Sequence, residues 1–189
     1  LEPGLRAAPP AWLGYLSSTG VYGDHAGAVV TEESETRPSS DHARRRLAAE
    51  ARWRALPGAH VFRLGGIYGP GRSALDDVRA GRARRIVKPG HRVARIHVDD
   101  VVGALLASLD RPRPGAVYNV VDDAPSASDE VVALACELLG APLPPAVPWT
   151  DPSVSPMARS FLQDERRVSN ARLHDELGLA LRHPDAASG

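Results

Sequence analysis

Residues 13–23 read LGYLSSTGVYG, and this stretch decides the fold. It begins with apolar residues, changes to the small hydroxyl-bearing residues Ser17, Ser18 and Thr19, and closes on Gly-Val-Tyr-Gly. Such a run is typical of a buried strand that presents polar groups at its carboxyl end. In an open parallel sheet, ligands bind at that end of the strands. A strand followed by a plain serine–threonine turn is the alternative that these residues leave open.

The segments that follow predict a parallel α/β unit. Ser39, Ser40 and Asp41 offer an N-cap for a helix at about 42–56, and residues 59–64 predict the next buried strand. Two strands joined by one helix should lie parallel, with a right-handed crossover. Within that helix the residues at helical spacing are Leu47, Glu50, Ala51 and Arg54.

The second half of the chain alternates short helices and strands. We expect helices at 73–80, 99–110, about 126–140 and about 170–178. Asp99 and Asp100 should start the second of these, and Ser126 with Asp129 resembles a capping box for the third. The expected strands are 86–87 and 93–96, joined through Pro89 and Gly90, then 116–121 and 168–169, with a Pro-rich connector at 142–156.

Composition narrows the class of protein. The 189 residues suffice for one domain or part of a larger one, and 23 basic residues balance 23 acidic ones. This balance gives no charge signal for nucleic acid or a membrane surface. The single cysteine, Cys136, excludes a disulfide within the chain and suits a reducing cytoplasm. We therefore expect a cytoplasmic protein that acts on a small molecule and binds neither nucleic acid nor a membrane.

Four motifs carry a family resemblance. SSTGVYG at 17–23 resembles the Ser-Ser-x-x-Val-Tyr-Gly segment of extended short-chain dehydrogenases/reductases, the NAD-dependent epimerase/dehydratase family. RLGGIYGPG at 63–71, RIHVDD at 95–100 and VYNVVDD at 117–123 fit the same family in the same order. Each motif is weak alone, but four in order are a specific signal. The resemblance covers roughly residues 13–181.

The resemblance implies an α/β fold: the carboxyl-terminal part of a doubly wound, Rossmann-type parallel sheet with a small α/β substrate-binding lobe. We expect sheet strands within about 11–67 and 115–122, and the lobe within about 68–114 and 123–189. The family's Gly-rich dinucleotide loop should precede all of these segments, but the sequence contains no G-x-G-x-x-G after a strand and does not begin with Met. We therefore expect the half that binds the cofactor pyrophosphate to be missing from this chain.

The resemblance also implies NAD or NADP as cofactor and hydride transfer at a hydroxyl or carbonyl carbon. Ser18 would hydrogen-bond the substrate oxygen, and Thr19 would face the same cleft. The family's Tyr-x-x-x-Lys pair moves the proton and binds the nicotinamide ribose, and His42 and Arg46 stand at its two positions. An imidazole can act as acid or base near neutral pH, so His42 is a candidate proton carrier. Tyr22 is a second candidate.

Plainer interpretations stand beside these roles. His42 is also compatible with an exposed residue in the first helical turn, 44–46 with a solvated basic face, and Tyr22 with a ring packed under the loop. The missing Tyr and Lys favour a competing class of function: a non-catalytic nucleotide-binding or regulatory module of the same fold. The residues alone support a ligand-binding α/β domain.

Further cofactor neighbours follow from the resemblance. The start of RLGGIYGPG lies beside the nicotinamide in the family, so Leu64, Gly65 and Gly66 are expected there, together with Ser17. The alternative is a Gly/Pro turn after a strand.

Substrate contacts are expected from arginine. Sugar-nucleotide enzymes of the family often carry an Arg four residues before the His of His-Val-Asp-Asp, and here that position is Val93. Arg95 and Arg72 are the nearby candidates for a diphosphate, because guanidinium groups suit bidentate oxyanion contacts. We expect no metal site, since no histidine is spaced with Cys or carboxylates in a known ligand pattern. A homodimer is compatible with the resemblance.

Overall fold

Three parallel strands form the central sheet of the computed structural model, which describes residues 2–189 apart from the side chain of Met157. Their order is β1–β3–β7. Helix α2 joins β1 to β3, so the parallel βαβ unit predicted from the sequence is confirmed. Every residue of β3 is buried, as expected for this strand, and that includes His60 and Arg63. The bounds are β1 (Leu13–Ser18), α2 (Asp41–Arg54), β3 (Ala59–Leu64) and β7 (Val117–Val120).

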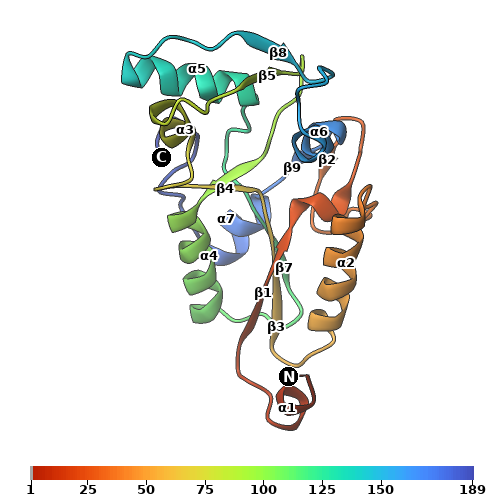
Figure 1. Ribbon diagram of the computed structural model, residues 1–189. Helices are drawn as coiled ribbons and strands as arrows, with labels where there is room; N and C mark the ends of the chain where they lie inside the picture. Colours follow the sequence, from red (N-terminus) through yellow and green to blue (C-terminus); the bar gives the residue numbers. More distant parts are fainter. Residues whose placement is uncertain (1) are drawn as a thin grey trace.

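Helices cover both faces of this sheet, which makes the fold doubly wound. Helix α2 lies on one side, and α4 (Val98–Asp110) lies with α7 (Ala171–Leu177) on the other (Figure 1). Phe62 and Tyr118 of the sheet share one buried apolar core with Val101 of α4 and Leu173 of α7. Helices α4 and α7 therefore pack on the sheet, although the sequence placed both within the substrate lobe.

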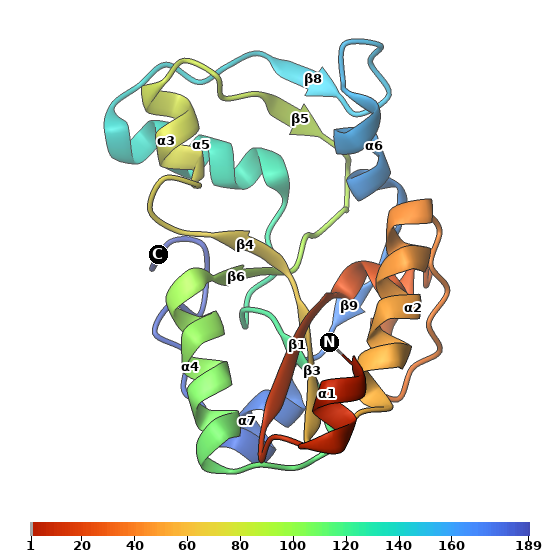
Figure 2. The ribbon, with the colours of Figure 1, turned by 60° about the horizontal axis from the view of Figure 1, so that its bottom comes forward.

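The lobe lies beyond the carboxyl ends of the strands (Figure 2). In it α3 packs on α5, α5 on β5, and β5 pairs in parallel with β8. Strand β6 pairs with β4, so the two short strands expected around Pro89 and Gly90 form but do not pair with each other. Strand β8 lies within the stretch predicted as a connector. The bounds are β4 (Gly66–Tyr68), α3 (Ala74–Arg79), β5 (Arg85–Val87), β6 (Arg95–His97), α5 (Ser128–Leu139) and β8 (Ala146–Pro148).

The remaining elements are short. Strands β2 (Val29–Val30) and β9 (Arg167–Val168) pair in parallel, which links the loop after β1 to the carboxyl-terminal segment. The sequence expected the second strand one residue later and did not predict β2, α1 (Glu2–Ala7) or α6 (Pro156–Gln163). Residues 19–22 form the 3-10 helix η1 (Thr19–Tyr22). Within residues 2–189 no helix is both long and apolar enough to cross a membrane.

The helix starts confirm one predicted cap and correct two. Ser40 caps α2, accepting the Ala43 N–H as predicted. Helix α4 is capped by His97, not by Asp99 or Asp100, because the His97 ring nitrogen accepts the Asp99 N–H. Helix α5 is the second correction: its capping carboxylate comes from Glu130, which accepts the N–H of Ala127, and not from Asp129 with Ser126.

Candidate active site

A row of buried polar side chains crosses the three strands near their carboxyl ends. Ser17 pairs in register with Arg63, and Arg63 with Asn119. Arg63 donates to both carboxylate oxygens of Glu50 on α2, at 2.6 and 3.2 Å, and Ser17 Oγ donates to Glu50 Oε2 at 2.8 Å. This network fastens α2 to the sheet. The Ser17 hydroxyl therefore binds Glu50 of α2. A buried hydroxyl with this partner does not fit the cofactor contact expected for Ser17.

Tyr22 belongs to the same network. Its side chain is fully buried, its hydroxyl donates to Asn119 Oδ1 at 2.7 Å, and it accepts from Arg63 Nη1 at 2.9 Å. The Arg63 guanidinium also lies 4.8 Å from the centre of the Tyr22 ring. Burial raises the pKa of Tyr22. A shielded, doubly engaged hydroxyl does not suit a proton carrier, so we assign Tyr22 to packing beneath the loop.

Ser18 is the last residue of β1, and its environment differs from that of Ser17. Its side chain is partly exposed, and its Oγ accepts the Gly20 N–H at 3.1 Å, which caps η1. This bond orients the oxygen and leaves the hydroxyl proton for another acceptor. Thr19, the next residue, is buried. Of the three hydroxyl-bearing residues in this stretch, Ser18 is the one positioned to meet a ligand.

His42 lies at the same end of the molecule as Ser18. Arg46 Nη1 donates to the Leu16 carbonyl oxygen at 3.1 Å, which ties the middle of α2 to β1. The start of α2 lies near the carboxyl end of β1 (Figure 1), so the helix and the strand run in opposite directions. His42 precedes Arg46 by about 6 Å of helix rise, and Ser18 follows Leu16 by about 6.6 Å of strand rise, both toward this end. His42 is exposed in the first turn of α2.

The glycines after β3 differ from one another. Gly65 donates its N–H to the Val120 carbonyl oxygen, and a Cβ placed on Gly65 would lie 2.8 Å from the Ala94 carbonyl oxygen. Gly66 is exposed, and the nearest atom to its hypothetical Cβ is 3.7 Å away. The Leu64 side chain is buried in the core. Gly66 therefore has room for a methyl group, although its own N–H donates to the Ala94 carbonyl oxygen at 2.9 Å. Gly65 permits a close approach between two segments, and Leu64 contributes packing.

Alanine substitutions should separate these two glycines. We expect Gly65→Ala to lower the free energy of unfolding by about 1–3 kcal/mol, because its methyl group would collide with backbone that cannot easily move. Gly66→Ala is the matched control and should stay within about 0.5 kcal/mol of the parent. Urea denaturation followed by circular dichroism measures both. Equal stability of the two variants would contradict the close approach at Gly65.

A cavity of about 380 Å³ in the lobe is lined by Tyr68, Arg72 and Arg95 with residues of α3 and α5. It brings together the two arginines predicted to contact substrate. Arg95 Nη1 donates to the carbonyl and hydroxyl oxygens of Ser126 at 2.7 and 2.9 Å, so it holds the start of α5 in place. Arg72 is exposed, and among the described residues nothing hydrogen-bonds its guanidinium. Arg72 is thus the better placed of the two to bind an anion.

Asp122 contacts the backbone of Arg95, one of the residues that line this cavity. It is 3% exposed, its Oδ1 accepts the Arg95 N–H at 3.4 Å, and its Oδ2 has no hydrogen-bond partner among the described residues. Burial raises the pKa of Asp122 to about 6. Burial also raises the pKa of Tyr68 to about 12, with the Asp122 and Asp100 carboxylates adding to the effect.

The raised pKa of Asp122 makes its contribution to stability depend on pH. The folded value of about 6 exceeds the ordinary 3.8, so the contribution is present below about pH 4 and is lost as pH rises through about 6. We expect the free energy of unfolding of Asp122→Asn, relative to that of the parent, to rise by about 2 kcal/mol between about pH 4 and pH 8. Urea unfolding of both proteins at the two pH values measures this. A difference that does not change with pH would contradict the raised pKa.

Comparison with known proteins identifies the family of this chain. The model of the NAD dependent epimerase/dehydratase family matches residues 5–121. The chain belongs to this family. Protein YeeZ of Escherichia coli K12 is 32% identical over 90% of the chain and 58% of YeeZ. The GDP-6-deoxy-D-mannose reductase of Pseudomonas aeruginosa is 32% identical over 87% of the chain and 59% of the reductase.

Solved structures of other proteins share the fold. A conserved protein of unknown function from Silicibacter pomeroyi is 50% identical with a TM-score of 0.90, covering 94% of this chain and 64% of that one. MoeE5 in complex with UDP-glucuronic acid and NAD is 25% identical with a TM-score of 0.78, covering 97% and 64%. RMD from Pseudomonas aeruginosa, complexed with NADPH, is 26% identical with a TM-score of 0.76, covering 98% and 67%. Structural neighbours in this family thus hold NAD or NADPH.

Sequence reasoning missed two residues of this region. Glu50 was noted at helical spacing with Leu47, and a carboxylate on an apolar helix stripe was the available signal of a buried partner. Asn119 gave no such signal. It lies within a strand motif, and its hydrogen bond to the Tyr22 hydroxyl depends on how the loop after β1 folds back.

Proposed function

We propose that this chain forms the catalytic part of an NAD(P)-dependent oxidoreductase or epimerase/dehydratase that acts on a hydroxyl or carbonyl carbon of a small, sugar-like molecule. The observation that supports the proposal is that Ser18 and His42 lie toward the carboxyl-terminal end of β1, with Arg46 one helical turn behind His42 and bonded to the Leu16 carbonyl oxygen. Family membership and neighbours solved with NAD, NADPH and a sugar nucleotide support it.

The residues present fit the nicotinamide end of the cofactor. Gly66 is exposed just after the end of β3, and the guanidinium of Arg46 has donors beyond the one bonded to Leu16. Those donors would bind the ribose hydroxyls in place of the family's lysine. When bound, the cofactor accepts or supplies the hydride. The described residues contain no Gly-rich loop for its pyrophosphate.

The protein's own residues would handle the oxygen and its proton. Ser18, held by the Gly20 N–H, donates its hydroxyl proton to the substrate oxygen and orients it. The exposed imidazole of His42 takes the proton when the hydroxyl is oxidised and returns it in the reverse direction. Arg72 at the lobe cavity supplies a cation for an anionic group of the substrate.

An exposed apolar surface supports a partial cofactor site. Leu16 of β1 is 42% exposed, and on α4 Val102, Leu106 and Leu109 are each about half exposed, at 49%, 56% and 51%. Exposed apolar side chains of this size, on the edge strand β1 and on α4, are typical of positions that another part of a protein covers. The chain spans 58% of YeeZ and 64% of the Silicibacter protein. We propose that a phosphate-binding part of the fold covers this surface and completes the cofactor site.

Calorimetry with NADH and NADPH on the 189-residue chain tests this division. We expect little or no binding, because the pyrophosphate would lack its loop. Tight binding to this chain alone would overturn the partial site. Oxidation or reduction of the nucleotide by a longer protein that contains this chain, across a panel of hydroxy compounds and sugar nucleotides, tests the catalytic assignment.

A non-catalytic module of the same fold is the second candidate function. It is favoured by one observation: His42 and Arg46 stand where the family's Tyr and Lys are expected. Nucleotide binding without turnover would support the module and remove the catalytic proposal.

A further inference from the structure

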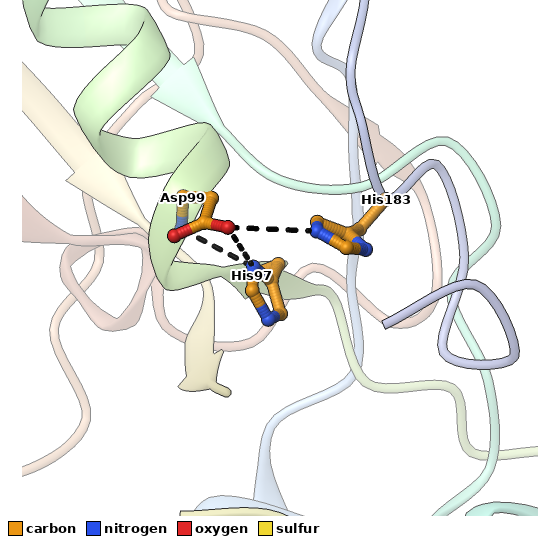
Figure 3. A group of neighbouring side chains, drawn as sticks. All are labelled: His97, Asp99 and His183. Atoms are coloured by element: carbon orange, nitrogen blue, oxygen red, sulfur yellow. Dashed lines mark hydrogen bonds and ion pairs between the residues drawn. The ribbon is translucent and has the colours of Figure 1, made fainter. Parts of the chain in front are cut away.

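Two histidines and one aspartate converge outside the proposed active site (Figure 3). His97 ends β6, Asp99 lies in the first turn of α4, and His183 comes from the segment after α7. Asp99 Oδ2 is 3.9 Å from His97 Nδ1 and 3.8 Å from His183 Nε2. We propose that these three side chains bind a divalent transition metal ion of the Zn²⁺ class.

The donor set suits such an ion. Zn²⁺ binds imidazole nitrogen and carboxylate oxygen, and three protein ligands leave a fourth position for water. Ligand atoms about 2.0–2.2 Å from a tetrahedral Zn²⁺ lie about 3.3–3.6 Å from each other. The two separations from Asp99 need to shrink by a few tenths of an ångström, and all three ligand atoms already lie within 4.8 Å of one another. The Asp99 side chain is 53% exposed, so a small rotation can close the gap and still leave the fourth position open to water.

The tautomer of His183 is set for metal binding. Its Nδ1 lies 2.6 Å from the Ser188 carbonyl oxygen, which can only accept, so Nδ1 carries the proton. The lone pair of Nε2 is then free, and this atom is the one that faces Asp99. A ligating histidine commonly donates its second N–H to a carbonyl in this way.

His97 also directs a lone pair at the cluster. Its Nδ1 accepts the Asp99 N–H at 3.2 Å, so this nitrogen is unprotonated. A metal ion at Nδ1 takes the place of that single capping bond. The His97 side chain is buried, and the Tyr68 ring packs edge-on against it with centroids 5.2 Å apart, which fixes the imidazole.

The two segments are held together before any ion binds. The Asp100 carboxylate is 2% exposed and accepts the N–H groups of Arg182 and His183, at 2.7 and 3.0 Å. The imidazoles of His97 and His183 lie with centroids 3.8 Å apart. A preformed arrangement lowers the ordering cost of binding. The ion would therefore fasten the segment after α7 to the start of α4, a structural role that does not depend on the proposed catalysis.

Zinc titration tests the site directly. The chain is freed of metal with EDTA, and Zn²⁺ is added in competition with a chromophoric chelator. We expect one strongly bound equivalent, and at least tenfold weaker binding by Asp99→Asn and by His183→Gln. Mg²⁺, which prefers oxygen ligands, should not compete. Both substituted side chains are at least partly exposed, so the variants should fold, and circular dichroism without metal checks this.

The chain supplies a matched control. His174 Nε2 lies 2.9 Å from Asp123 Oδ1, a histidine–carboxylate pair that belongs to no group of three ligands among the described residues. His174→Gln should bind Zn²⁺ as the parent does. In a second readout, Zn²⁺ should raise the melting temperature of the parent and of His174→Gln but not of His183→Gln. Equal affinity in the parent and His183→Gln, or no strongly bound equivalent, would overturn the site.

Discussion

Replacing Glu50 with alanine should lower the free energy of unfolding by about 3–5 kcal/mol, because it leaves the buried guanidinium of Arg63 without its carboxylate partner. The side chains of Glu50 and Arg63 are 1% and 4% exposed, and their closest contact is 2.6 Å. The substitution also removes the acceptor of the buried Ser17 hydroxyl. An uncompensated charge and an unpaired hydroxyl would then lie between α2 and the sheet. Urea denaturation at neutral pH measures the loss.

The control for this prediction is an exposed ion pair. Glu35 contacts Arg37 at 2.7 Å, with the two side chains 68% and 56% exposed, and Glu35→Ala should cost at most about 1 kcal/mol. The double variant Glu50→Leu with Arg63→Met should regain part of the loss, because no charge remains buried. A loss of less than about 1 kcal/mol for Glu50→Ala would show that the pair is solvated in the native protein.

Replacing His42 with alanine should lower turnover by roughly a hundredfold to ten-thousandfold, the usual contribution of a positioned acid or base. The measurement is kcat for nucleotide reduction by a longer protein that contains this chain. KM should change little, because the imidazole is assigned to the proton and not to binding. His42 is exposed in the first turn of α2, so the fold should tolerate the change.

Arg45→Ala is the control for His42. Arg45 is exposed on the same helix and has no assigned role, so its replacement should leave kcat within about twofold of the parent, a change of roughly 0.4 kcal/mol in barrier. Unchanged kcat in His42→Ala would remove this residue from the chemistry. Loss of kcat together with loss of folded protein would assign it to stability, so circular dichroism accompanies each assay.

Local sequence patterns predicted the parts of the fold that short-range physics controls. The cap at Ser40 and the strands beside α2 depend on neighbouring residues, and both were confirmed. The end of α5 at Gly140 is a further case, because glycine adopts the left-handed conformation found there without strain. The family resemblance could also be recognised from the sequence, because each of its four motifs is a continuous stretch of residues.

The pairing of strands that are distant in sequence could not be predicted in this way. Strand β5 pairs with β8 and β6 with β4, and no local pattern specifies which short strand another will find. The position of His183 could not be predicted either, because it depends on contacts between distant residues, among them the hydrogen bond of its N–H to the Asp100 carboxylate.

By itself, then, the sequence determined a parallel α/β sheet, its family and the stretch that carries Ser18. Tertiary structure decided the role of each polar group in that stretch. Ser17 and Ser18 are adjacent hydroxyls with the same chemistry, but side chains alternate across a strand, and Glu50 receives one of them while the other stays partly exposed. The Tyr22 hydroxyl is likewise assigned by its partners, because it is buried and hydrogen-bonded to Arg63 and Asn119. A side chain's role depends on which partner the fold brings within hydrogen-bond distance, and those partners are far away in sequence.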